Sequence, residues 1–351
     1  MKYVIMFGSI ILAVLFSVLP NLSKPKPLWW KVSAVIFVIL ALILTIGPPI
    51  AGNLSTSKYM KEGYYDDLNI SINVRKGQFK YDDVNNFWIK ALGKSEIANL
   101  ENLEFNNKII IRYKELPEEF RSENKLVVKA KYNKEYDALE FIETKFINPP
   151  FIYPFVPNLD ERIKILNLHV PLAWIAVVAY LMSMIYAIRY LKTNDLKWDT
   201  YNASTASIGN LFAILATVTG MLWAKYNWGN YWNWDPRQTS IFILIMIYAA
   251  FFALRAAIDN EERRAKLSSV YSIISFITVP FLVFVLPRLA SGLHPGSKDD
   301  VNAGPLVSSQ TSALDSTLVW SFGLSLFALT VIYFWILNLK MRTSKIEHKL
   351  S

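Results

Sequence analysis

The sequence predicts a polytopic α-helical membrane protein of about seven spans with an all-β domain outside the membrane. Several uninterrupted apolar runs approach the 17–25 residues that a membrane-spanning helix needs. Charged residues make up only 19% of the 351 residues, whereas an ordinary soluble domain carries about 25%. One long polar stretch, 51–167, contains short alternating segments that are typical of strands. A wholly soluble protein is therefore excluded.

The seven apolar runs are the expected spans. The first is retained as a span, because only Lys2 precedes it and no convincing cleavage site of small residues precedes the charged loop at 24–26. Pro280 is expected to kink the sixth span. The runs are 3–19, 29–50, 170–188, 204–223, 239–257, 267–286 and 317–337.

Lysine and arginine are concentrated in alternate connections. The loops between spans one and two, three and four, and five and six, together with the tail, are the richer ones. Since basic loops stay in the cytoplasm, the tail is predicted to be cytoplasmic and the N-terminus outside, in the inner (cytoplasmic) membrane. The outer face then carries 51–167, 224–238 and 287–316. The net charge of +9 reflects these loops and is poor evidence for nucleic acid, which we do not expect as a partner.

The outer polar stretch is expected to form one compact β-domain, either a small barrel or a sandwich. Segments such as 108–113 and 125–132 alternate apolar and polar residues, and four prolines between 149 and 157 predict a stiff connector back to the membrane. The expected organisation is two N-terminal transmembrane helices (1–50), the β-domain (65–147), the connector (148–167), a five-helix membrane domain (168–340) and a cytoplasmic tail (341–351).

A tryptophan-rich loop lies between spans four and five. Four of the 11 tryptophans fall within 223–234, and an aromatic belt at the membrane interface does not explain the glycine, aspartate and arginine among them. Closely spaced indoles suit a large planar ring, and the charged residues could fix its polar edge groups. The candidate binding residues are Trp228, Gly229, Tyr231, Trp232, Trp234, Asp235 and Arg237.

Two histidines are predicted to lie beside this loop. His169 opens the third span and His294 follows the sixth, so four spans separate them and both face outside. His348 is in the tail and is expected to be solvated. A lone histidine at a span end is usually interfacial, but two on one face beside indoles favour metal ligation. Neutral imidazole is a standard axial ligand of haem iron. We therefore expect His169 and His294 to hold haem b without covalent attachment. The chain has no cysteine, which excludes CxxCH attachment.

Three motifs resemble those of haem-handling membrane proteins of cytochrome c biogenesis. Residues 228–239 look like the WWD signature of that superfamily. His-Val-Pro-x-Ala-Trp at 169–174 and Leu-His-x-Gly-Ser at 293–297 are similar to the C-protein family of the cytochrome c maturation system. The resemblance covers about 160–340. It implies that His169 and His294 ligate haem b, that the tryptophans and Asp235 form a platform, and that Trp174 belongs to the site. It also implies a haem chaperone, an ATP-binding-cassette protein and other maturation subunits as partners.

The β-domain resembles the chaperone E-protein family of the same pathway. The resemblance lies in the strand at 108–113, the Leu116-Pro117-Glu-Glu-Phe120 turn and the apolar strand that follows, and it implies an OB-like barrel. That family attaches haem covalently through a histidine with a tyrosine four residues on. Phe146 and Pro150 stand at those positions here, and the domain contains no histidine. We therefore expect it to dock partners rather than attach haem.

Three other functions stay open. A system II-type cytochrome c haem lyase or synthase is favoured by the Asp-Pro step at 235–236, but such enzymes resemble larger assemblies with additional paired histidines. A solute transporter with a β-domain would place ionisable groups near mid-membrane, where the third to seventh spans have almost none. A structural scaffold would not need the tryptophan-rich loop. Haem handling without catalysis is the expected function.

Overall fold

The computed structural model describes residues 2–350 except 20, 23, 54–55, 92–107, 158, 295 and 299–315. Parts of the predicted β-domain and of the predicted outer loop 287–316 therefore lie outside the described residues. The chain divides into two compact units. Met1–Ile46 and Arg162–Ser351 form a helical unit, and Gly47–Glu161 forms a β unit.

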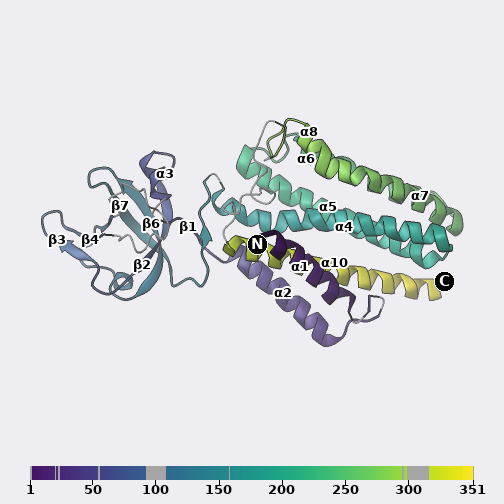
Figure 1. Cartoon of the computed structure of the whole chain (residues 1–351), viewed down its shortest axis with the longest axis horizontal. Helices are drawn as coiled ribbons and strands as arrows, with labels where there is room; N and C mark the ends of the chain where they lie inside the picture. Colours follow the sequence, from purple (N-terminus) through teal and green to yellow (C-terminus); the bar gives the residue numbers. More distant parts are fainter. Residues whose placement is uncertain are drawn as a thin grey trace. The chain divides into compact units, whose positions relative to one another are not determined.

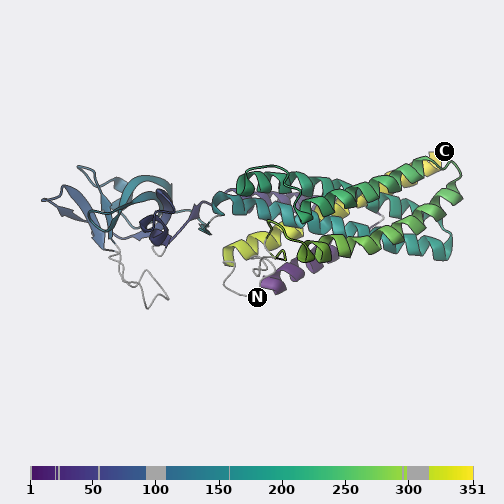
Figure 2. The ribbon, with the colours of Figure 1, turned by 90° about the horizontal axis from the view of Figure 1, so that it is seen from above.

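The helical unit is a bundle of long apolar helices (Figures 1 and 2). Among the described residues, six helices are long and apolar enough to cross a membrane, and the apolar helix Tyr3–Val18 is shorter. The prediction of a polytopic helical membrane protein is confirmed for these six, and a role for the first helix as a span stays a prediction. The helices are α1 (Lys2–Val18), α2 (Leu28–Ile46), α4 (Ile163–Thr193), α5 (Leu196–Trp228), α6 (Pro236–Ala256), α7 (Glu261–Pro280), α8 (Leu286–Leu289) and α10 (Ser316–Leu350).

Helices α4 and α5 begin seven and eight residues earlier than the apolar runs indicate. The predicted connector is therefore too long, because its last residues are the first turn of α4. In α5, the early polar residues are satisfied within the protein. Asp195 caps the helix by accepting the backbone N–H of Lys197 at 3.0 Å. Asp199 is buried and makes a bidentate pair with Arg255 of α6, at 2.5 and 2.8 Å. Paired charges allow a helix to continue beyond its apolar run.

Two hydrogen bonds fix which helix ends lie together. Arg162 Nη1 donates to the carbonyl oxygen of Tyr226 at 2.9 Å, and Lys164 Nζ donates to that of Ile46 at 3.1 Å. The first turn of α4, the last turn of α5 and the end of α2 therefore share one end of the bundle. We call this the site end. The Asp199–Arg255 pair lies near the start of α5 and the end of α6, and so at the opposite end.

The sixth predicted span changes helical type at its proline. Helix α7 ends at Pro280, and the next turn, Phe281–Val285, is a π-helix that leads into α8. Proline has no N–H and its ring clashes with the preceding turn, so a wider turn accommodates it. The expected irregularity therefore takes the form of a π-helical turn, which delivers the chain to the loop that carries His294.

The bundle core is built around close contact between α4 and α5. A Cβ on Gly209 of α5 would stand 2.9 Å from Cε1 of Tyr180, so the absence of a side chain there lets the two helices approach. The Tyr180 ring stacks on Tyr248 of α6 with ring centroids 3.7 Å apart. Buried aliphatic and aromatic residues of α4, α5, α6, α7 and α10 surround this pair. This packing holds the helices that carry the site residues.

The β unit contains a six-stranded mixed sheet (Figure 1). Its strand order is β2-β6-β7-β5-β4-β3, with β5 and β7 parallel and the other neighbours antiparallel. A second, two-stranded parallel sheet pairs β1 with β8, and one short helix, α3, completes the unit. The bounds are β1 (Ile50–Ala51), α3 (Ser57–Lys61), β2 (Asp67–Val74), β3 (Lys80–Asp82), β4 (Phe87–Ala91), β5 (Lys108–Ile111), β6 (Asn124–Asn133), β7 (Ala138–Ile147) and β8 (Tyr153–Pro154).

The described strands do not form the expected closed barrel. The edge strands β2 and β3 are not paired with each other in the part of the unit that is described. The chain turns sharply between them, where Gly77 has a φ of 76° and the N–H of Gln78 donates to the carbonyl of Arg75. Apolar residues at alternate positions of β2 face the core, as the period of two predicts. The strand prediction is thus confirmed, and the OB-like fold stays a prediction.

Candidate functional site

The tryptophan-rich loop starts where α5 ends. Gly229 caps the helix with a φ of 84°, a left-handed conformation that favours glycine. Its N–H donates to the carbonyl of Lys225 at 3.1 Å, and the Lys225 ammonium donates back to the carbonyl of Gly229 at 2.8 Å. Gly229, predicted as a binding residue, therefore has a structural task. It turns the chain off α5 at the site end.

Asp235 ends the loop and is the N-cap of α6. Its Oδ1 accepts the N–H of Arg237 at 2.9 Å, and Pro236 occupies the first position of the helix. The other carboxylate oxygen accepts the N–H of Leu293 at 2.7 Å. Asp235 is only 4% exposed. The carboxylate therefore points into the protein and joins the start of α6 to the loop after α8.

The same carboxylate holds His294. Nδ1 of the imidazole lies 2.7 Å from Oδ1 of Asp235, and the edge of Trp228 packs against the ring with centroids 4.6 Å apart. Burial acts to raise the pKa of Asp235, but the hydrogen bond and charge of His294 and the two backbone N–H groups outweigh it and hold that pKa at about 2. The carboxylate is therefore ionised at neutral pH and accepts a hydrogen bond from the Nδ1–H group. Nε2 is the nitrogen left for a ligand.

His169 is held in the same way by different partners. Its Nδ1 lies 3.0 Å from the carbonyl oxygen of Ala216 and 3.2 Å from Oγ1 of Thr219, both on α5. The Thr219 hydroxyl donates its own proton to backbone carbonyls, so both atoms act as acceptors and Nδ1 carries the proton. A Cβ on Gly220 would stand 2.8 Å from Cε1 of the imidazole. The ring therefore lies directly against α5.

The two histidines lie near each other at the site end. His169 lies within electrostatic range of both His294 and Arg237. Among the described residues, neither imidazole has a hydrogen-bond partner at Nε2. The prediction that membrane topology brings the two imidazoles and Trp228 to one end of the bundle agrees with this geometry. Their role as iron ligands stays a prediction.

The remaining aromatic residues of the loop do not form one flat surface. Trp232 meets Trp234 edge to face, with ring planes at 90°, and also packs against Phe242 at 78°. Trp234 has a φ of 53° and is 72% exposed, and Tyr231 is also exposed. The loop therefore offers indoles in two orientations rather than the single plane that the sequence suggests.

Three residues of the site carry roles that the sequence analysis missed. Gln238 is buried and bridges the loop, because its Oε1 accepts the N–H of Asn233 at 2.8 Å and its Nε2 donates to the carbonyl of Tyr231 at 3.2 Å. A Cβ on Gly292 would stand 2.8 Å from Oδ2 of Asp235. Gly220 is the third. A polar residue in the first turn of an apolar helix, two residues after the Asp-Pro step, is the signal that identifies Gln238.

Two predicted residues are only partly connected to this centre. Trp174 lies about 140° around α4 from His169, so the helix does not place the two on one face. Its indole Nε1 is buried with no hydrogen-bond partner in the described part of the chain. Arg237, in the first turn of α6, is within electrostatic range of Asp235 and of Arg288. Two positive charges within electrostatic range of each other repel, and an anion nearby would relieve that repulsion.

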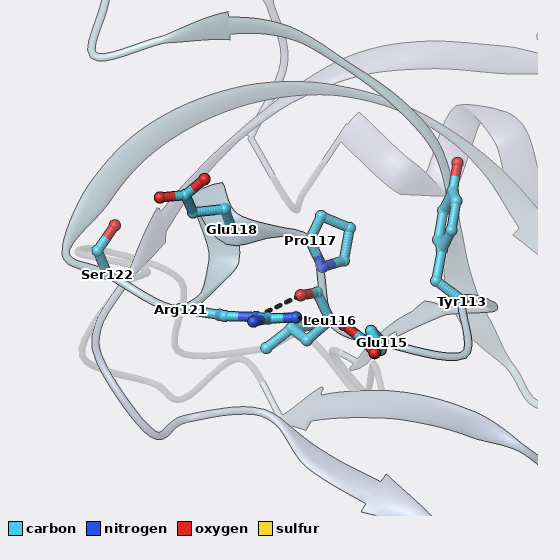
Figure 3. Close-up of a pocket in the computed structure, with 7 residues that line it drawn as sticks. All are labelled: Tyr113, Glu115, Leu116, Pro117, Glu118, Arg121 and Ser122. Carbon is cyan, nitrogen blue, oxygen red and sulfur yellow. Dashed lines mark hydrogen bonds and ion pairs between the residues drawn. The ribbon is translucent and has the colours of Figure 1, made fainter.

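A shallow depression in the β unit is a weaker candidate (Figure 3). Its lining includes Arg121, whose Nε donates to the carbonyl of Leu116 at 2.5 Å and whose guanidinium pairs with Glu115 at 3.4 Å. The Arg121 guanidinium is therefore already bound by residues of its own loop. Phe146, the position where the resemblance would require a histidine, is on β7 and 44% exposed. No group of three or more histidine, cysteine, aspartate or glutamate residues that could hold a metal ion occurs among the described residues.

Comparison with known proteins decides the family. Residues 151–351 match the family described as Heme exporter protein C. That range covers more than half of the chain and contains every residue of the candidate site. The chain belongs to the heme exporter protein C family. The resemblance seen in the three sequence motifs is thereby confirmed at the level of the family.

Individual relatives agree with this assignment. The chain is 34% identical over 122 residues to Heme exporter protein C of Bradyrhizobium diazoefficiens, which covers 35% of this chain and 46% of that protein. It is 29% identical over 183 residues to Heme exporter protein C of Escherichia coli K12, covering 52% and 72%. Cytochrome c biogenesis protein CcsA of Fagopyrum esculentum is 32% identical over 115 residues, covering 33% and 34%. The chain spans about half the length of the first curated relatives it matches.

The family match begins after the β unit is almost complete. It starts at residue 151, whereas the six-stranded sheet ends with β7 at Ile147. The candidate site lies on α4, α5, α6 and the loop after α8, all within the matched range. The six-stranded sheet and the α1–α2 hairpin are outside the matched range.

Proposed function

We propose that the protein holds haem b non-covalently at the outer face of the cytoplasmic membrane, through His169 and His294, and delivers it to a haem chaperone or to the cytochrome c maturation complex. The observation that carries the proposal is the pair of imidazoles at the site end. Each is fixed through Nδ1, and each has an Nε2 without a hydrogen-bond partner among the described residues. Membership of the heme exporter protein C family supports the identity of the ligand.

The residues present fit a haem. A haem supplies an iron centre with two axial positions that imidazole nitrogens can fill. Fixing Nδ1 by a hydrogen bond sets the tautomer and ring orientation that iron ligation through Nε2 requires. Gly220 has no side chain, which leaves room for the His169 ring against α5. The edge of Trp228 packs against the ring of His294. Trp232 and Trp234 add apolar surface for the macrocycle.

The charges near the site suit the carboxylates of the same ligand. Arg237 and Arg288 lie within electrostatic range of each other, and Lys298 follows in the same loop as His294. Arginine pairs with carboxylates through two parallel hydrogen bonds. We therefore assign Arg237 the recognition of a haem propionate, with Arg288 and Lys298 beside it. Asp235 serves the site through His294, since both of its oxygens are already bound by groups of the protein.

The β unit is proposed to dock the chaperone or another maturation subunit. Its strand order, with β5 and β7 parallel and with β2 and β3 at the two edges, is compatible with the partly open barrel of an OB-like fold. It has no histidine for covalent haem attachment. The basic loops orient this unit and the N-terminus to the outside and the tail to the cytoplasm. Energy from ATP would come from an ATP-binding-cassette partner.

The proposed activity is handling of haem without catalysis. A system II-type lyase or synthase remains the second candidate, because CcsA is among the relatives. The number of histidines favours haem handling without catalysis. The whole chain has three, and one of them is in the tail, so a second histidine pair is not available for a second haem.

The test is a hemin titration of the full-length apoprotein in mild detergent, followed by the Soret band. His169→Ala and His294→Ala should each weaken binding by more than about tenfold. His348→Ala, in the tail, is the matched control and should leave the titration unchanged. Equal affinity in all four proteins would contradict the proposal.

A further inference from the structure

The two imidazoles of the site are anchored by chemically unlike acceptors. Nδ1 of His294 donates to a carboxylate, at 2.7 Å from Oδ1 of Asp235. Nδ1 of His169 donates to neutral oxygens, the carbonyl of Ala216 at 3.0 Å and the hydroxyl of Thr219 at 3.2 Å. A charge-assisted hydrogen bond is shorter and about twice as strong as a neutral one. The three distances follow that order, since the contact with the carboxylate is the shortest.

This difference acts directly on the nitrogens that would bind iron. A carboxylate that accepts the Nδ1 proton draws it away from the ring, so electron density at Nε2 rises and the imidazole becomes a stronger ligand. A backbone carbonyl or a hydroxyl has the same effect but to a smaller extent. His294 is therefore the stronger donor of the pair.

The carboxylate is also the more firmly fixed anchor. Asp235 is buried and accepts two further hydrogen bonds, from the N–H of Arg237 at 2.9 Å and from the N–H of Leu293 at 2.7 Å. The first of these caps α6, and the second holds the residue next to His294. Withdrawing His294 would thus disturb a helix cap and a buried charge together. His169 has no comparable connection, since its acceptors belong to the continuous helix α5.

We infer that the two axial ligands are unequal: His294, held by Asp235, is the ligand that stays on the iron, and His169 is the ligand that an incoming group replaces when haem leaves the protein. The inference rests on the proposed function, because it concerns the order in which the same two ligands act. Asp235 is then a positioning residue that acts through His294.

Carbon monoxide identifies the ligand that is retained. Full-length protein in detergent is loaded with hemin, reduced with dithionite and exposed to carbon monoxide, which replaces the weaker axial ligand. The C–O stretch, measured by infrared spectroscopy, then reports the ligand on the opposite side of the iron. The wild-type band should coincide with that of His169→Gly and differ from that of His294→Gly. A wild-type band that coincides with His294→Gly, or three identical bands, would overturn the inference.

A second measurement keeps the inference testable if a glycine variant does not fold. The reduction potential of the hemin-loaded protein is compared for Asp235→Asn and Thr219→Val. Asparagine keeps an oxygen for capping but loses the charge, and valine keeps the shape of threonine but loses the acceptor. The potential should rise in Asp235→Asn by more than in Thr219→Val, because a weaker donor stabilises ferric iron less. Equal shifts of the reduction potential in the two variants, or a larger rise in Thr219→Val, would contradict the inference. A wild-type protein that binds no hemin would instead remove the proposed function.

Discussion

The imidazole of His169 lies in the space that a side chain on Gly220 would need. A Cβ built on that glycine is 2.8 Å from Cε1, 3.4 Å from Nδ1 and 3.6 Å from Nε2 of the ring. Nonbonded carbon atoms do not approach to 2.8 Å. The His169 ring can therefore occupy this position only because residue 220 has no side chain. The close contact presses Nδ1 towards Ala216 and Thr219, one turn or less earlier on α5.

Gly220→Ala should therefore displace the ring and break its anchor. We expect hemin affinity to fall by about tenfold or more while the helix itself becomes slightly more stable, because alanine favours a helix over glycine by about 0.5–1 kcal/mol. Gly8→Ala in α1 is the matched control, as a Cβ there meets nothing within 4 Å. Hemin titration and thermal unfolding of both variants check this. Unchanged affinity in Gly220→Ala would mean that the ring position does not matter.

Gln238 should govern the order of the tryptophan-rich loop. Gln238→Ala leaves the N–H of Asn233 and the carbonyl of Tyr231 without this partner, and each lost hydrogen bond should cost about 0.5–1.5 kcal/mol. Gln238→Glu keeps the acceptor for Asn233 and loses only the donor, so its effect should be smaller. Hydrogen–deuterium exchange over 229–235 should rise in the order wild type, Gln238→Glu, Gln238→Ala. Equal exchange in the three proteins would show that the loop is held by other contacts.

The buried pair Asp199–Arg255 should support the bundle without touching the site. The side chains are 5% and 16% exposed, so Asp199→Ala leaves an uncompensated buried charge and should cost about 3–5 kcal/mol. The double replacement Asp199→Leu with Arg255→Met removes both charges and should recover most of the loss. Thermal unfolding in detergent measures both. A double variant as unstable as the single one would argue that the pair is needed for its geometry.

The β unit should lose one stabilising contact in acid. The hydrogen bond from the Tyr132 hydroxyl and the ammonium of Lys61, at 3.0 Å, hold the pKa of Asp137 below its usual 3.8. Because the pKa is lowered in the folded state, the stabilisation is complete above the ordinary value and is lost as the pH falls through the folded one. Asp137→Asn should therefore lower the melting temperature at pH 6 and have less effect below pH 3.8. A constant difference between the two proteins across this range would contradict the assignment.

The sequence alone predicts the features that depend on long apolar runs, or on whether the number of spans between two residues is odd or even. Six apolar helices follow from their hydropathy, and the placement of His169 and His294 at one end follows from the even number of spans between them. It was insufficient where a short-range contact decides. The first turns of α4 and α5 are polar, so the sequence suggests loops there. In α5, the pairing of Asp199 with Arg255 allows the helix to include its polar turns.

The role of Asp235 shows the same difference at the site. Among tryptophans, its charge suggested contact with a ligand. In the structure, the carboxylate is an N-cap and the anchor of His294. The Asp-Pro step is a common start of a helix, so capping could have been predicted, but the contact with residue 294 depends on how α6 and α8 pack. Likewise, the expected single plane of indoles failed because Trp234 has a positive φ that turns its ring against Trp232.

The most direct test of the account is the absorption spectrum of the full-length protein purified in mild detergent, recorded with and without dithionite and repeated after acid–acetone extraction. Two histidine ligands and no covalent bond predict a Soret band that shifts on reduction and disappears from the protein on extraction. Haem that stays with the protein after extraction would mean covalent attachment at a residue outside the proposed ligand pair. Absence of a Soret band, even after hemin is added, would contradict haem binding altogether.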